Sequence, residues 1–334
     1  MQVSSFVQKL PKVELHLHIE GTLEPDLKFK LAQRNGIELA EKTAQEVYDS
    51  YQFTDLASFL ASYYDGMQVL RTSADFYDLA MEYLKKAAAQ NVRYAEIFFD
   101  PQAHTCRGVS FDTVISGLHR AQVEAEQTLG IQSALIMCFL RDFQAEYAMA
   151  TLLEALPYKK WILGVGLDSD ETGNAPDKFA AVFARARQEG FLLTMHADVD
   201  IKDSIEHIRQ LIEEIKVDRI DHGTNVGENS QYVDYLVEHK IGLTCCPVSN
   251  TWVSDGSKIP LIAKLAERGV KVSINSDDPA YFRGYINENF QLVADELGAD
   301  SEFLAQLSLN AVDISWAAPS LKERLRAEIR ATLN

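Results

Sequence analysis

Short apolar runs rich in β-branched and aromatic residues recur along the chain, and longer stretches with helical spacing separate them. Several runs are apolar almost throughout, which indicates strands buried on both faces of a parallel sheet. The runs that predict strands cover residues 13–18, 92–100, 133–141, 162–168, 191–197, 219–222, 241–247 and 270–275.

The segments between these runs repeat apolar residues every three or four positions, as amphipathic helices do. The clearest predicted helices cover residues 177–189, 201–215 and 261–268. Pro176 suits the start of the first helix, and Gly190 and Gly269 suit C-terminal caps. Strands and helices therefore alternate through most of the chain.

Eight strands alternating with helices predict an α/β fold, the (β/α)8 TIM barrel. A doubly wound open sheet is the alternative, but no Gly-x-Gly-x-x-Gly turn follows a predicted strand. Residues 22–90 hold several helical patterns and predict an insertion at the barrel mouth that can act as a lid. The chain after Glu288 is helical, and no linker-like segment interrupts residues 1–334, so we expect a single domain.

The composition narrows the classes of ligand. The 334 residues carry a formal net charge of −17, so DNA and long RNA are poor partners, whereas a free base or nucleoside meets little repulsion. No segment approaches the roughly 18 apolar residues of a membrane span. The four cysteines form no Cys-x-x-Cys pair, and the first residues lack a long apolar run, so we expect free thiols and a cytoplasmic protein.

Histidine and aspartate residues fall at the ends of four predicted strands, where a TIM barrel builds its active site. Residues two apart on a strand point to the same side, so a His-x-His pair can chelate a divalent metal. The residues concerned are His16 and His18 on the first strand, His196 on the fifth, His222 on the sixth, and Asp277 and Asp278 after the eighth.

Three imidazoles and one carboxylate, from His16, His18, His196 and Asp277, suit Zn²⁺ or another metal such as Fe²⁺ or Mn²⁺. The metal lowers the pKa of bound water. His222 lacks a partner at ligand spacing, so we predict that it acts on that water as a base or electrostatic clamp. No lysine ends the fourth strand to bridge two metals, so one ion per chain is expected.

Adjacent carboxylates point in different directions, so Asp278 can hydrogen-bond a ring nitrogen of the substrate while Asp277 binds metal. The chain has no Gly-x-Ser-x-Gly, no phosphate-binding glycine loop and no His-Glu-x-x-His. A metal phosphatase that uses His-x-His is a further alternative, but basic residues that would clamp a phosphate are missing near the strand ends.

The order of the His-x-His, His-Ala, Asp-His-Gly and Ser-Asp-Asp-Pro motifs resembles the adenosine/adenine deaminase family of the amidohydrolase superfamily. The likeness runs from Leu10 to about Ala318. It is closer to the adenine-type bacterial branch than to the nucleoside deaminases. The marks of that branch are Glu20, Phe-Phe-Asp-Pro-Gln at 98–102 with His104, and Val-Gly-Leu-Asp-Ser at 165–169.

The resemblance implies a role for each matching residue. His222 would orient or deprotonate the metal-bound water, Asp278 would hydrogen-bond purine N7, and Glu20 and Gly166 would contact the base. Water would attack C6, and an amine would leave a 6-oxopurine. The residues implied to hold zinc are His16, His18, His196 and Asp277.

The general acid departs from the family pattern. The family reads His-Ala-Gly-Glu after the fifth strand, and its glutamate protonates N1 of the purine; this chain has Val199 in that position. Loss of a general acid typically costs on the order of 10²–10⁴ in rate. The candidate replacements are Asp198, Asp200 and Glu206, with Asp198 and Glu206 slightly favoured.

The rebuilt acid segment favours an N6-substituted adenine, such as N6-isopentenyladenine, with adenine as the other candidate base. Phe59, Tyr64 or Met67 from the insertion would line an apolar annex for the alkyl group. Two alternatives stay open, namely an adenosine deaminase and a catalytically impaired purine-binding barrel. The sequence leaves the oligomeric state open.

Overall fold

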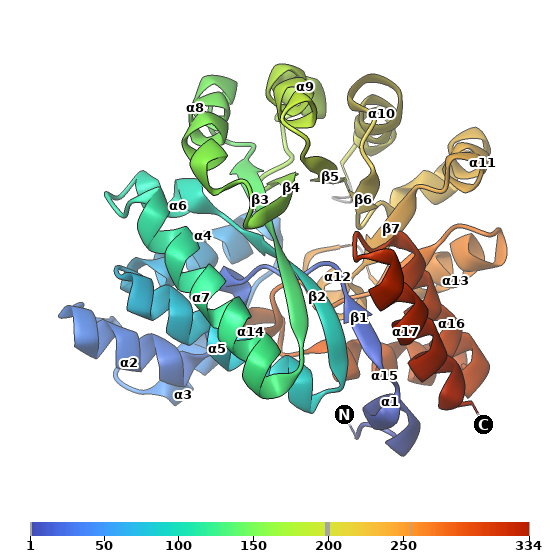
Figure 1. Ribbon diagram of the computed structural model, residues 1–334, viewed down its shortest axis with the longest axis horizontal. Helices are drawn as coiled ribbons and strands as arrows, with labels where there is room; N and C mark the ends of the chain where they lie inside the picture. Colours follow the sequence, from blue (N-terminus) through green and yellow to red (C-terminus); the bar gives the residue numbers. More distant parts are fainter. Residues whose placement is uncertain (1, 198–200, 255, 334) are drawn as a thin grey trace.

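The computed structural model describes residues 2–197, 201–254 and 256–333. Its strands are parallel, and their order around the sheet follows the chain from β1 to β8 (Figure 1). They are β1 (Lys12–Glu14), β2 (Val92–Phe99), β3 (Gln132–Leu140), β4 (Ile162–Asp168), β5 (Leu192–His196), β6 (Arg219–Asp221), β7 (Gly242–Cys245) and β8 (Val272–Ile274). The sheet closes just beyond β1 and β8, where His18 N donates to Asp277 O and Asp277 N donates to His16 O. The predicted (β/α)8 barrel is confirmed.

Helices that follow the strands form an outer layer around the sheet (Figure 1). They include α5 (Ser73–Ala89), α7 (Phe111–Leu129), α8 (Ala145–Ala155), α9 (Ala180–Gln188), α10 (Ser204–Arg209), α11 (Ser230–His239), α13 (Ile259–Glu267) and α16 (Ser301–Ile314). Gly190 follows α9 with φ of 92°, a left-handed conformation that glycine adopts without strain. Helix α10 continues as a π-helical segment, Gln210–Ile215, so the helix predicted for 201–215 starts three residues late and changes its winding.

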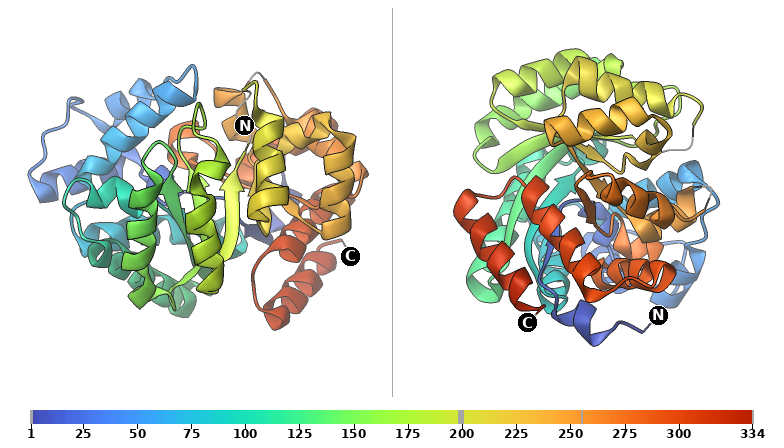
Figure 2. Two further views of the ribbon diagram at one scale, coloured as in Figure 1. Left: turned by 90° about the horizontal axis from the view of Figure 1, so that it is seen from above. Right: turned by 90° about the vertical axis from the view of Figure 1, so that its right-hand side faces the viewer.

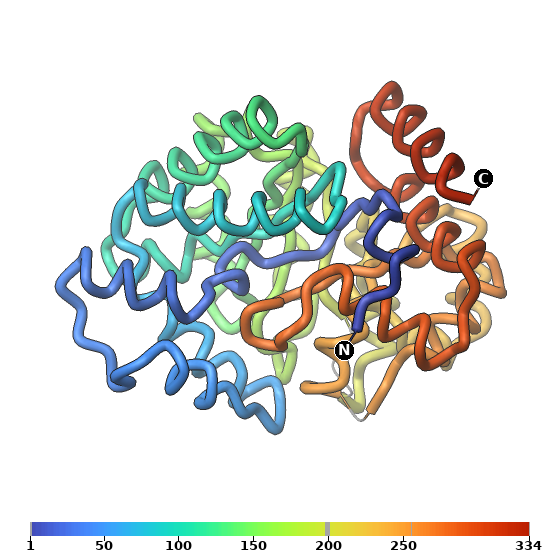
Figure 3. The backbone as a smooth tube through the Cα atoms, turned by 90° about the horizontal axis from the view of Figure 1, so that it is seen from below, coloured from blue at the N-terminus to red at the C-terminus, as the bar shows by residue number. Residues whose placement is uncertain are grey.

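Additional helices lie between β1 and β2. They are α2 (Pro25–Asn35), α3 (Ala44–Ser50) and α4 (Leu56–Gly66), and they form the blue group at one side of the barrel in Figures 2 and 3. Helix α5, which the sequence placed in the same insertion, instead packs beside α7 and against β2 as part of the outer layer.

The chain after β8 is helical, as predicted. It contains α14 (Pro279–Phe282), α15 (Ile286–Leu297), α16 and α17 (Pro319–Ala331), and α17 packs along α16 (Figure 2). The short N-terminal helix α1 (Ser5–Lys9) lies beside α15 (Figure 3), where Ser4 N donates to Gln291 Oε1 at 2.8 Å. Within the part of the chain that the structure describes, no helix combines the length and apolar character needed to span a bilayer.

A fully buried ion pair fills the barrel interior near the start of β6. The Arg219 guanidinium pairs with the Glu96 carboxylate and lies 4.3 Å from the centre of the Trp316 ring. Arg219 Nη2 also donates to Leu15 O at 3.3 Å. This cation therefore links β6 to β1, β2 and the segment after α16.

Replacing Arg219 by alanine is expected to lower the free energy of unfolding by about 3–5 kcal/mol, because it leaves the Glu96 carboxylate buried and unpaired. Urea unfolding followed by circular dichroism measures the change. The matched double variant Arg219→Met, Glu96→Leu removes both charges and is expected to lose less. A loss below about 1 kcal/mol in the single variant contradicts the prediction.

Candidate active site

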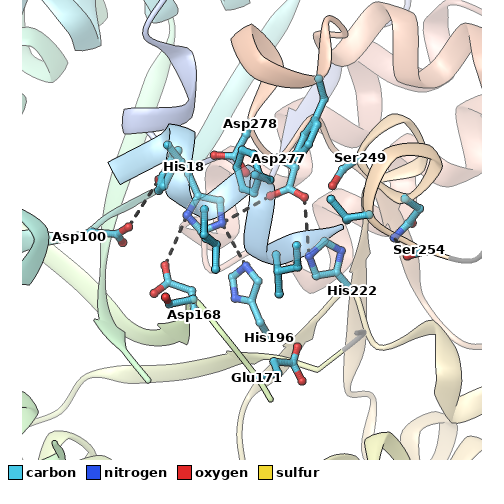
Figure 4. A pocket seen from close by; sticks show the side chains of 18 of the residues that line it. His18, Asp100, Asp168, Glu171, His196, His222, Ser249, Ser254, Asp277 and Asp278 are labelled. Atoms are coloured by element: carbon cyan, nitrogen blue, oxygen red, sulfur yellow. Dashed lines mark hydrogen bonds and ion pairs between the residues drawn. The ribbon is translucent and has the colours of Figure 1, made fainter. Parts of the chain in front are cut away.

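Three imidazoles and one carboxylate meet at the C-terminal end of the barrel, and Figure 4 shows His18, His196 and Asp277 of this set together with His222. His18 Nε2 lies 3.1 Å from His196 Nε2 and 3.5 Å from Asp277 Oδ1. His16 Nε2 lies 3.2 Å from the same carboxylate oxygen. One ligand atom from each of the four buried residues lies within 4.8 Å of the others, so a single ion can contact all four.

The ring nitrogens that face away from this centre have partners of their own. His16 Nδ1 lies 2.9 Å from Thr244 Oγ1, and His196 Nδ1 lies 3.2 Å from Leu167 O. Because a carbonyl oxygen only accepts, His196 Nδ1 carries the hydrogen and leaves the Nε2 lone pair for a metal. The outer partners thus fix the ring orientation that metal binding requires.

The electrostatics of the four residues fit a divalent metal. Burial lowers the pKa of His16 to about 3 and also lowers the pKa values of His18 and His196, so all three imidazoles are neutral at physiological pH. Burial opposes ionisation of Asp277, but His16 and the neighbouring imidazoles hold its pKa well below the ordinary value. Neutral imidazoles and an ionised carboxylate are the ligand forms that bind zinc.

An orphaned atom at the centre supports the same fit. His16 Nε2 is buried and has no hydrogen-bond partner among the described residues. Buried polar atoms are nearly always satisfied in native proteins, so this nitrogen needs a ligand that the polypeptide does not supply. A metal ion held by the four residues would satisfy it.

His222 lies at the edge of this cluster. Its Nε2 is 3.7 Å from Asp277 Oδ2, and its ring centre is 4.5 Å from that of His16. His222 and Asp277 both have left-handed backbone conformations, with φ of 57° and 65°, which non-glycine residues adopt mainly where the fold imposes them. The turns after β6 and β8 therefore aim both side chains at the same centre.

A second ligand set would join His222 and Cys246 to His16 and Asp277. Burial raises the pKa of the Cys246 thiol well above its ordinary value, which disfavours the thiolate form that binds a metal. The set that contains His18 and His196 offers three imidazoles and one carboxylate, and His222 is not a ligand in it.

Asp278 is buried next to the metal cluster. Burial and the neighbouring Asp277 raise the pKa of Asp278 well above its ordinary value, which favours the protonated carboxyl group, a hydrogen-bond donor. A Cβ at Gly21 would lie 2.1 Å from Asp278 Oδ1 and 2.7 Å from Asp278 Cα. Only glycine allows the segment after β1 to approach Asp278 this closely.

The cluster lies in a pocket, and the rest of the pocket wall is largely apolar where helices supply it. Helix α4 supplies most of this wall, and α12 (Pro247–Val253), the loop after it and α14 complete it. The lining residues of these elements are Leu56, Phe59, Leu60, Tyr63, Tyr64, Ser249, Asn250, Val253, Ser254 and Phe282. Of the three residues that the sequence suggested for an apolar annex, Phe59 and Tyr64 line the pocket and Met67 is buried elsewhere.

Besides Glu171, two carboxyl groups of the pocket were not among the site residues predicted from the sequence, although both stand in segments that marked the family branch. Asp100 follows β2 and Asp168 ends β4; both line the pocket and both are buried. Burial raises the pKa of Asp168 to about 7 and the pKa of Asp100 well above its ordinary value. Their position at strand ends is the same signal that identified the histidines, and it was available in the sequence.

Glu20 is buried but does not line the pocket. Its Oε1 accepts hydrogen bonds from Asp100 N at 3.1 Å and from His104 Nε2 at 2.9 Å. Glu20 therefore fixes the position of Asp100. Gly166 lies inside β4 against Cys138, whose Sγ would be 2.6 Å from an added Cβ, and it does not line the pocket either.

The structure does not bring Glu206 to the pocket. Helix α10 buries His207 and Ile208, which turns Glu206 outward, where it pairs with Arg209 at 2.6 Å. The hydrogen bonds from Arg209 lower the pKa of Glu206 to about 2, so this exposed carboxylate is a poor proton donor. Asp198, Val199 and Asp200 lie outside the described residues.

Comparisons with known proteins find relatives that match this chain over nearly its whole length. The chain is 50% identical over 315 residues to an uncharacterized deaminase of Schizosaccharomyces pombe, covering 94% of this chain and 93% of that protein. It is 48% identical over 330 residues to an adenine deaminase of Rhodospirillum rubrum, covering 98% of each. The crystal structure of an adenine deaminase from Arthrobacter aurescens superimposes with a TM-score of 0.93 at 40% identity, covering 97% of this chain and 99% of that one.

The family model for adenosine deaminase matches residues 11–332, nearly the whole chain. The relatives named adenine deaminase confirm the predicted resemblance to the adenine-type branch. The chain therefore belongs to the adenosine deaminase family and is a hydrolytic deaminase of the amidohydrolase superfamily.

Proposed function

We propose that this protein hydrolyses the 6-amino or 6-alkylamino group of a free purine base, either adenine or an N6-substituted adenine such as N6-isopentenyladenine. The observation that carries the proposal is the buried set of three imidazoles and one carboxylate with the buried Asp278 carboxyl group beside it. This set offers metal ligands and a hydrogen-bond donor for a purine ring nitrogen in one pocket.

We propose zinc as the metal, with one ion per chain. Zinc takes histidine nitrogen and carboxylate oxygen as ligands, and bound zinc lowers the pKa of a water molecule towards neutrality. The ligands would be His16, His18, His196 and Asp277.

The residues around the metal site carry out the proton transfer and hold the base. His222 accepts a proton from the water that attacks C6, and Asp278 donates a hydrogen bond to N7 of the base. When the C6–O bond has formed, the C6–N6 bond breaks and the amine leaves with a proton returned by His222. A 6-oxopurine remains.

The carboxyl groups of Asp100 and Asp168 favour a free base over a nucleoside. Both line the pocket, and Tyr63 and Tyr64 from α4 lie close to this region, with Tyr63 Oη 3.5 Å from Asp100 Oδ2. A free purine carries an N9–H group that can donate a hydrogen bond to a carboxyl oxygen, whereas a nucleoside carries a sugar at N9. The names of the adenine deaminase relatives support the same choice.

The test is steady-state turnover of adenine, adenosine and N6-isopentenyladenine by the zinc-loaded protein, followed by purine absorbance. Conversion of either base at a rate above that of adenosine is expected. Faster conversion of adenosine would make the protein a nucleoside deaminase. No turnover of any of the three, with metal bound, would favour a catalytically impaired purine-binding barrel.

The apolar wall of α4 predicts how the two bases can be separated. Leu60→Trp is expected to lower kcat/KM for N6-isopentenyladenine at least tenfold and to leave adenine within about threefold, because the indole fills space that an N6-alkyl group needs. Leu60→Met, which nearly conserves volume, serves as the control. Equal losses for both bases would show that the alkyl group does not lie against Leu60.

A further inference from the structure

A proton must reach N1 of the purine when water adds to C6, and the family's glutamate for this step is replaced by Val199. We propose that Glu171, in the loop after β4, is the carboxyl group that donates this proton. The inference rests on the proposed function and assigns one further catalytic residue to the same reaction.

Glu171 is built into the pocket wall. Its side chain is 3% exposed, and it lines the same pocket as His196, His222 and Asp277. Glu171 Oε2 lies 3.5 Å from His207 Nδ1 and 3.7 Å from Arg141 Nη1. Glu171 is thus a buried carboxyl group with a cation and an imidazole within ion-pair distance.

Arg141 fixes Glu171 close to the end of β5. The same Nη1 atom that approaches Glu171 donates to His196 O at 2.9 Å. The family's glutamate follows this histidine by three residues, so Glu171 reaches the same end of the barrel from the neighbouring strand. The Arg141 guanidinium also stabilises the carboxylate that remains once the proton has left.

The orientation of a purine ring selects the same residue. N1 is bonded to C6 and N7 is bonded to C5, so the two nitrogens lie on opposite sides of the reacting C6–N6 bond. In Figure 4, Asp278 lies on one side of the imidazole cluster of His18, His196 and His222, and Glu171 lies on the other. With N7 at Asp278, N1 faces Glu171.

The other acidic residues of the pocket are committed elsewhere. Asp277 is a proposed metal ligand, and Asp278 is proposed to donate a hydrogen bond to N7. Asp168 lies 3.5 Å from His18 Nδ1, and Figure 4 places Asp100 and Asp168 together on the side of His18 away from His222. Among the carboxyl groups that the structure describes in this pocket, Glu171 alone lies on the side where N1 is expected.

The proton transfers balance over one turnover. As the C6–O bond forms, His222 takes a proton from water, Glu171 gives its proton to N1, and the C6=N1 π electrons move to N1. The C6–N6 bond then breaks, and the amine leaves with the proton from His222. The C6 hydroxyl returns its proton to Glu171 as the C6=O bond forms, so both residues regain their starting states.

The test uses Glu171→Gln in the full-length zinc-loaded protein. The variant is expected to lower kcat by roughly 10²–10⁴-fold. Its KM, metal content and affinity for unsubstituted purine are expected to stay within about threefold of the wild type. Glu189→Gln, which changes a partly exposed glutamate paired with Arg185 outside the pocket, is the matched control and is expected to retain wild-type kcat.

A second variant separates proton donation from a structural role. Adding Val199→Glu to Glu171→Gln restores a carboxyl group at the family's position and is expected to raise kcat at least tenfold above the single variant. The proposal is overturned if Glu171→Gln keeps more than about a third of wild-type kcat, if metal or purine binding falls with kcat, or if the added glutamate gives less than threefold recovery. Absence of turnover by the unchanged protein would instead overturn the proposed function.

Discussion

Asp277→Asn is expected to remove the bound metal and to lower kcat/KM by roughly 10³-fold or more. The carboxamide keeps the shape of the side chain but loses the negative charge that lies 3.2 Å from His16 Nε2 and 3.5 Å from His18 Nε2. Metal-assisted hydrolysis draws several kcal/mol of transition-state stabilisation from the ion, and each 1.4 kcal/mol is about tenfold in rate. Elemental analysis and steady-state turnover of the best base measure both effects.

Thermal unfolding provides an independent measure of the same site. A metal that binds only the folded protein stabilises it, so added Zn²⁺ is expected to raise the Tm of the metal-free wild type and to leave that of Asp277→Asn nearly unchanged. Asp234→Asn, at an exposed aspartate paired with Arg268, is the control and is expected to behave as the wild type. Full metal content in Asp277→Asn would remove this residue from the ligand set.

The barrel could be predicted from the sequence because its strands are buried on both faces and therefore read as apolar runs. The strand ends were less accurate. The first predicted strand ends at His18, whereas β1 ends at Glu14, and the chain beyond it pairs only through single bridges of Leu17 with Asp277 and of His18 with Phe98. These contacts join residues far apart in the chain, so no local sequence pattern predicts them.

The candidate metal ligands could be named in advance because two rules apply to them directly. Residues two apart on a strand share a side, which pairs His16 with His18, and the strand ends of a TIM barrel meet at one face. The structure accordingly brings these residues together with His196 and Asp277.

The direction of a side chain beyond a strand or on a short helix follows no such rule. Glu20 begins a 3₁₀ turn that points it at His104, and the burial of His207 and Ile208 turns Glu206 towards solvent. Glu171 lies in a loop three residues beyond β4, so its approach to His196 depends on Arg141, a residue 30 positions away in the chain. Tertiary contacts of this kind decide which acidic residues reach the pocket.

His222→Gln is expected to lower kcat by roughly 10²–10⁴ with metal content unchanged, because an amide cannot exchange the proton that general base catalysis requires. His222 Nε2 lies 3.7 Å from Asp277 Oδ2, close enough to reach a water at the metal site. The left-handed backbone at this position suits histidine and asparagine better than glutamine. His222→Asn is therefore the control for backbone strain, and it is expected to show the same loss of kcat.

Metal analysis of the His222 variants distinguishes the two possible ligand sets. If His222 acts only on the water, His222→Gln keeps the metal whereas His196→Ala loses it. If the ion is held instead by His16, His222, Cys246 and Asp277, the two results are exchanged, and His222→Gln loses the metal together with activity. Because His18 Nε2 lies 3.1 Å from His196 Nε2 and 3.5 Å from Asp277 Oδ1, we expect the first result, which leaves His222 as the base and separates its role from that of every proposed ligand.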